Sequence, residues 1–155
     1  MQALNLPDHG VKTKHGPDGA RIFDPVRRAW VVLTPEEWVR QHVLNYIVKE
    51  AGCPVSLIAV ERKLVMNGMT RRADLVVHDR RGRPVLLVEC KAPEVKVGQS
   101  AFEQAARYNT VFRVPYLMVT NGLVHYVCSV EHDAGRIDFL PALPPYDQLC
   151  AAYPA

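Results

Sequence analysis

The sequence predicts an α/β fold in which helices flank a central mixed sheet. Residues 34–52 and 98–113 carry apolar side chains at helical spacing, whereas the other apolar runs are short and strand-like. Residues 71–93, RRADLVVHDRRGRPVLLVECKAP, hold two such runs around a charged turn, which is typical of an antiparallel hairpin. A helix between the run at 84–91 and the run at 115–120 would be a crossover, so these two strands are predicted to be parallel.

The N-terminal part of the chain predicts a loose segment, a strand pair and a helix. Residues 1–20 contain several Gly, Pro, Asp and Lys, and we predict a flexible lead-in to a single domain at 21–155. Residues 21–34 predict two short strands around an Asp-Pro turn. In the helix that follows, Thr34 is the predicted N-cap, and Glu37 stands at the capping-box spacing.

The rest of the chain predicts an alternation of strands and helices without an internal repeat. The predicted elements are strands at 56–65, 72–78 and 84–91, the helix at 98–113, strands at 115–120, 123–128 and 136–140, and a short helix within 144–153. This order favours one sheet with helices packed on it.

Composition limits the classes of protein to consider. The N-terminus lacks the basic and apolar regions of a signal peptide, and no apolar run is long enough to span a membrane. We therefore expect a cytoplasmic protein with no membrane partner. The four cysteines lie far apart without a C-x-x-C pair, which argues against a zinc site and against disulfides.

Positive charge is concentrated in one part of the sequence. The net charge is +3, but residues 61–91 alone hold eight Lys or Arg and four acids. A basic region beside candidate active-site acids suits a polyanionic ligand. A solvated hairpin rim explains the same charges, and the sequence leaves both interpretations open.

An aspartate opens the first apolar run of 71–93, and Glu-Cys-Lys closes the second. Side chains alternate along a strand, so Glu89 and Lys91 are predicted to share a face, and hairpin pairing can bring Asp74 beside Glu89. Two neighbouring carboxylates repel when buried, and a hard cation such as Mg²⁺ relieves that repulsion. We expect Asp74, Glu89 and the backbone carbonyl of Cys90 to bind Mg²⁺. Lys91 would position or deprotonate a water, or neutralise developing charge. The alternative is a structural ion pair in which Lys91 bridges the two acids without a metal.

The motifs in this region resemble a known family of nucleases. The pieces RRADLVV, LLVECKAP, FEQAARYN and VTNG, in this order, resemble the N-terminal nuclease domain of type I restriction enzyme R (HsdR) proteins, within the PD-(D/E)xK nuclease superfamily. TPEEWVRQHV resembles the opening helix of the family, so the resemblance covers about residues 34–122. It implies a restriction-endonuclease-like core that cleaves DNA with Mg²⁺, for which Mn²⁺ can substitute. The chain has Ala73 where proline is frequent, and it has no Walker motif. We therefore expect a stand-alone nuclease domain rather than a motor subunit.

The resemblance also implies a role for each matching residue. Asp74 and Glu89 match the metal-binding acids, and Lys91 matches the catalytic lysine. Gln104 and Tyr108 match a Q-x-x-x-Y motif, and their spacing places them on one face of the predicted helix. We predict that these two side chains orient Lys91 or a phosphate; the alternative is that they are interior polar groups bonded to the sheet.

Other charged residues carry weaker expectations. Glu37 matches a helical acid that contributes to the metal site in relatives, although capping alone would explain it. Arg71 and Arg72 are predicted to contact nucleic acid, or else to belong to a solvated turn. Arg40 is predicted to contact phosphate or, more readily, to pair with Glu37 through helical spacing. Glu61 is predicted to face solvent rather than approach the acids.

Two functions remain open at this point. The first is a metal-dependent DNA endonuclease. The second is a catalytically silent module that binds nucleic acid or assembles with subunits of a restriction, defence or DNA-repair complex. A homodimer is one alternative for the oligomeric state, because many nucleases need two sites to cut a duplex.

Overall fold

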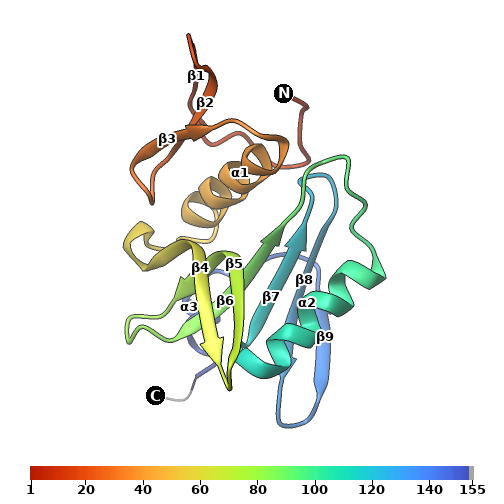
Figure 1. The fold of residues 1–155 in the computed structure, drawn as a ribbon. Helices are drawn as coiled ribbons and strands as arrows, with labels where there is room; N and C mark the ends of the chain where they lie inside the picture. The colour runs from red at the N-terminus through yellow and green to blue at the C-terminus, as the bar shows by residue number, and fades with distance from the viewer. Residues whose placement is uncertain (154–155) are drawn as a thin grey trace.

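The computed structural model describes residues 1–153 and confirms the predicted mixed sheet flanked by helices (Figure 1). Six strands form the central sheet in the order β4-β5-β6-β7-β8-β9. They are β4 (Ile58–Met66), β5 (Met69–His78), β6 (Pro84–Cys90), β7 (Tyr116–Thr120), β8 (His125–Glu131) and β9 (Arg136–Leu140). Helix α2 (Gln99–Phe112) connects β6 to β7, and these two strands pair in parallel as predicted. The other neighbouring strands of this sheet pair antiparallel.

Helices cover both faces of the central sheet. On one face, Val43 of α1 (Pro35–Lys49) and Leu149 of α3 (Tyr146–Cys150) belong to the same apolar cluster as Val77. On the other face, Phe102 of α2 packs in a second cluster that contains Val76. The adjacent valines of β5 thus enter opposite layers, as alternation along a strand requires. A short 3-10 turn, η1 (Val55–Leu57), leads into β4.

A small antiparallel sheet precedes α1. It consists of β1 (Thr13–Gly16), β2 (Gly19–Asp24) and β3 (Ala29–Val32), in that order. β2 and β3 are the strand pair predicted around the Asp-Pro turn, whereas β1 lies within the segment predicted as a lead-in. The buried Asp24 carboxylate accepts the N–H groups of Val26 and Arg27 at 2.8 and 2.9 Å, which fixes this turn.

The start of α1 follows the sequence prediction in part. The Thr34 hydroxyl accepts the N–H of Glu37 at 3.0 Å, so the predicted N-cap is confirmed. The Glu37 carboxylate does not complete a capping box. It binds the half-buried Arg27 at 2.7 Å and the buried Arg40 at 2.8 Å instead, because two guanidinium groups stabilise it more than one backbone N–H.

The N-terminal residues pack against the turn between β7 and β8. The Asn5 N–H donates to the Gly122 carbonyl at 2.8 Å, and the Trp38 indole N–H donates to the Gln2 carbonyl at 2.8 Å. Gly122 has a φ of +86°, and a Cβ atom there would lie 2.8 Å from a methyl carbon of Leu4. This contact requires glycine, both for its backbone conformation and for space.

The four cysteines are free thiols, and Cys53, Cys90 and Cys128 are buried. Among residues 1–153, the helices are too short or too polar to cross a membrane.

Candidate active site

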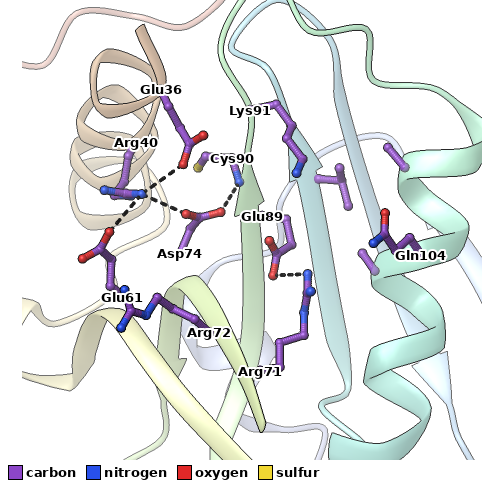
Figure 2. A pocket seen from close by; sticks show the side chains of 13 residues that line it. Glu36, Arg40, Glu61, Arg71, Arg72, Asp74, Glu89, Cys90, Lys91 and Gln104 are labelled. Carbon is purple, nitrogen blue, oxygen red and sulfur yellow. Dashed lines mark hydrogen bonds and ion pairs between the residues drawn. The ribbon is translucent and has the colours of Figure 1, made fainter. Parts of the chain in front are cut away.

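A polar cavity of about 310 Å³ lies beside the end of β6, between α1 and α2 (Figure 2). Acidic and basic side chains make up most of its wall. They are Glu36, Glu61, Asp74 and Glu89, together with Arg40, Arg71, Arg72 and Lys91; Cys90 and Gln104 also line it. The cavity therefore brings together eight of the ten residues predicted for the site, and it leaves out Glu37 and Tyr108.

Asp74 is fixed by a strand and a helix at once. The register of β5 and β6 pairs Leu75 with Val88, which places Asp74 next to the end of β6. There the Cys90 N–H donates to Asp74 Oδ2 at 2.7 Å. From α1, Arg40 Nη2 donates to Asp74 Oδ1 at 2.9 Å. Both oxygens of the carboxylate are thus oriented before any ligand arrives.

Glu89 is a buried carboxylate that lacks a hydrogen-bond donor on one oxygen. Arg71 Nη2 lies 2.8 Å from Glu89 Oε1, but this contact is an ion pair rather than a directed hydrogen bond. Burial and, to a lesser extent, the negative charge of Asp74 raise the pKa of Glu89 to about 7, although Arg71 opposes the rise. The neighbouring carboxylates of Asp74 and Glu89 therefore form a site where a bound cation would relieve their mutual repulsion.

Arg71 connects Glu89 with Tyr108. The Arg71 guanidinium carbon lies 4.1 Å from the centre of the Tyr108 ring, within the range of a cation–π contact. Tyr108 is thus one step removed from the cavity, on the far side of Arg71. Neither predicted role of Tyr108, at the cavity or at the sheet, includes this contact.

Lys91 lines the cavity from the end of β6, and Gln104 lines it from α2 (Figure 2). Lys91 follows the last residue of β6, and its backbone N–H donates to the Thr120 carbonyl at 2.8 Å. Its side chain is exposed and forms no ion pair or hydrogen bond with residues 1–153. The structure therefore contradicts the alternative in which Lys91 bridges the two acids. Arginines fill that role, Arg40 at Asp74 and Arg71 at Glu89.

Glu37 does not occupy the position predicted for a metal ligand. Its side chain is buried between Arg27 and Arg40 and does not line the cavity. Glu36, one residue earlier, lines the cavity instead. Burial and the charge of Asp74 raise the pKa of Glu36. Glu36 lies four residues before Arg40, and this spacing in the sequence could have indicated that Glu36 shares a helix face with Arg40.

Arg40 links α1 to the acids through a chain of ion pairs. Burial lowers its pKa, but the charges of Glu37 and Asp74 prevail and raise the pKa above its ordinary value. The predicted pairing of Arg40 with Glu37 is confirmed, and the contact with Asp74 is additional. Glu61 is exposed to solvent, as predicted, but it also lies 3.6 Å from Arg40 and lines the cavity, so it approaches the acids as well.

The donor set fits a hard divalent cation. Asp74 and Glu89 offer carboxylate oxygens, and Glu89 Oε1 has no hydrogen bond to lose. Within residues 1–153, no three His, Cys, Asp or Glu side chains form a cluster by themselves. Mg²⁺ does not need one, because it commonly binds one or two carboxylates and keeps several waters. The Cys90 thiol is not a candidate, because burial holds its pKa well above the usual value and keeps it neutral.

Two comparisons with known proteins give matches. A family described as "Type I restriction enzyme R protein N terminus (HSDR_N)" matches residues 35–144. A solved fragment described as an HsdR subunit of a type I restriction enzyme from Vibrio vulnificus YJ016 shares the fold, with a TM-score of 0.53 and 24% sequence identity. The match covers 77% of this chain and 25% of the other, so this chain spans about a quarter of its length. No curated protein matches significantly.

Proposed function

We propose that this chain, which belongs to the family of type I restriction enzyme R protein N termini, is a Mg²⁺-dependent nuclease domain that hydrolyses phosphodiester bonds in DNA. The observation that carries the proposal is the Glu89 carboxylate, which is buried beside Asp74 and is paired with Arg71. Neighbouring carboxylates away from water repel each other, and a hard cation bound between them relieves that repulsion.

The predicted site residues that line the cavity would then have distinct chemical roles. Asp74, Glu89 and the Cys90 carbonyl would hold the ion. When bound, the ion would acidify a water and stabilise charge on the phosphoryl oxygens. The Lys91 side chain, which is unpaired among the described residues, would donate to that water or to a phosphate oxygen and neutralise developing charge.

The remaining polar groups would orient the acids and the substrate. Arg40 holds Asp74 in place through Oδ1. Arg71 and Arg72, on the wall of the cavity, would bind phosphate oxygens next to the cleaved bond. Gln104 faces them from α2 and would donate its amide hydrogens to the same group.

The test is a cleavage assay on linear, circular and single-stranded DNA with Mg²⁺ or Mn²⁺, and with EDTA as the metal-free control. We expect metal-dependent cleavage by the wild-type chain and at least a hundredfold loss in Lys91→Ala, on the scale of one lost electrostatic group. Lys96→Ala removes an exposed lysine outside the cavity and should cleave normally. Wild-type rates in purified, folded Lys91→Ala would refute the mechanism.

A second candidate is a binding or assembly module that does not cut. It is favoured by the two arginines that already neutralise Asp74 and Glu89. The matched fragment belongs to a longer chain, so docking onto other restriction subunits is also a proposal. DNA binding that is stable in Mg²⁺, with no products on any substrate form, would support this function over the nuclease.

A further inference from the structure

The hairpin of β4 and β5 extends beyond the central sheet as a two-stranded ribbon, residues 61–73. β6 pairs with β5 from Leu75 to His78, whereas β4 and β5 stay paired out to Met66 and Met69. The free part spans about 20 Å at 3.3 Å per residue. In Figure 1 it runs past the end of α2, which β4 contacts.

The end of the ribbon is a tight turn. Asn67 and Gly68 have φ angles of 52° and 76°, the pair of positive values that a two-residue hairpin turn requires. Midway along the ribbon, Arg71, which pairs with Leu64, lies against Tyr108 of α2. The ribbon is thus held against α2 and closed by a defined turn at its tip.

Charge on the ribbon is mainly positive. Residues 61–73 hold four cations, Arg62, Lys63, Arg71 and Arg72, and one acid, Glu61, at the base of the ribbon. Lys63 stands opposite Arg72 in the register, so both side chains lie on the same face. Arg72 also lines the cavity, so the positive surface continues from the ribbon into the candidate active site.

The tip of the ribbon is apolar and exposed. Val65, Met66 and Met69 expose 67%, 41% and 39% of their surface. Large apolar side chains gathered at the end of a basic hairpin are unlike a purely solvated turn, and they suit a site that becomes covered by a partner.

We propose that this ribbon enters the major groove of duplex DNA and holds the duplex against the cavity. The groove is about 12 Å wide and 8.5 Å deep and admits a two-stranded ribbon. The Lys and Arg side chains of the ribbon would bind the phosphates along the edges of the groove, and the methionines would contact thymine methyl groups on its floor. An anionic membrane would attract the same surface. DNA is favoured because the base of the ribbon opens into the cavity, and the inference rests on the proposed function in this respect.

The experiment measures binding of the full chain to labelled duplex and single-stranded DNA by fluorescence anisotropy, in EDTA and over a series of salt concentrations. For Arg62→Gln/Lys63→Gln we expect the slope of log K against log salt on duplex DNA to fall by about two, nearly one per lost phosphate contact. Arg81→Gln, an exposed arginine in the turn between β5 and β6, is the matched control and should leave the slope unchanged.

A second variant tests the tip. Met66→Ser/Met69→Ser keeps the charge and the turn, so we expect weaker duplex binding with an unchanged salt slope and unchanged single-strand binding. Circular dichroism of each variant verifies the fold, which these exposed positions should not disturb.

Four outcomes would overturn the inference. The first is a ribbon variant whose salt slope equals that of Arg81→Gln, and the second is an equal loss of affinity for duplex and single-stranded DNA. The third is that the wild-type chain does not bind duplex DNA. The fourth is a ribbon variant that loses binding to phosphatidylserine vesicles while its affinity for duplex DNA stays intact. Because the binding assay contains EDTA and no divalent metal, its result does not depend on whether the chain cleaves DNA. A chain that binds as expected but never cuts would refute the nuclease alone.

Discussion

Tyr108 contacts Arg71, and Arg71 contacts Glu89, so a ring outside the cavity positions a cation inside it. We predict that Tyr108→Leu weakens DNA binding by roughly fivefold, on the order of 1 kcal/mol, because a cation–π contact is lost. Tyr108→Phe keeps the ring and should bind like the wild type. Anisotropy titrations compare the three proteins, and equal losses in both variants would assign the role to the hydroxyl instead.

His78 predicts how stability depends on pH. Burial lowers its pKa below the ordinary value of 6.5, Arg62 lowers it further, and the Leu57 carbonyl and Asp79 raise it. Below about pH 6.5 the unfolded chain binds a proton that the folded chain still excludes, so the free energy of unfolding falls as the pH drops. His78→Asn does not titrate and should show a weaker fall between about pH 8 and pH 5 in urea unfolding. Identical pH profiles for the two proteins would contradict this assignment.

At the scale of elements, α1 reaches the candidate active site through ion pairs that are buried or half-buried. Glu37 neutralises Arg27 and Arg40, and Arg40 in turn holds Asp74. Glu37→Gln leaves the buried Arg40 and the half-buried Arg27 short of a negative charge, so we predict a loss of about 3 kcal/mol in the free energy of unfolding. Glu36→Gln changes an exposed acid on the same helix and should lose less than about 1 kcal/mol.

Chemical denaturation measures both variants, and calorimetry with Mn²⁺ separates structure from metal binding. If Glu37 is structural, the folded Glu37→Gln protein still takes up the ion. A stable Glu37→Gln variant that fails to bind Mn²⁺ would restore Glu37 as a ligand.

The sequence predicted the central elements because their signals are local. Alternation and the turn in residues 71–93 indicated the β5–β6 hairpin, and its register brings Asp74 to the end of β6, where Glu89 lies. The role of Glu37 was not predictable in this way, because its partner Arg27 comes from the turn before β3, which only tertiary packing brings to α1. The contact of Arg71 with Tyr108 was likewise not predictable, because it forms only when α2 packs beside the hairpin of β4 and β5.

At the scale of the whole molecule, the first residues of the chain pack against the turn between β7 and β8. We predict that Gly122→Ala lowers the free energy of unfolding by about 1–3 kcal/mol, because its Cβ would meet Leu4 and its φ is positive. Gly135→Ala has a φ of +65° but no atom within 4 Å, so it measures the backbone strain alone, about 1 kcal/mol. Thermal unfolding compares the two.

The double variant Leu4→Ala/Gly122→Ala completes this comparison. It removes the clash but keeps the strain, so it should lose less than the two single variants combined. Strict additivity would show that Leu4 and Gly122 are not in contact in solution.

The bond from the Cys90 amide to Asp74 Oδ2 provides the molecule with a built-in reporter. A cation that draws electron density from that carboxylate would weaken the bond, and the resonance of one amide proton would shift. Amide hydrogen exchange at the same position would record how often the strand end and the carboxylate separate. The occupancy of the cavity by a cation can therefore be followed by NMR of the isotope-labelled protein without a dye or a mutation.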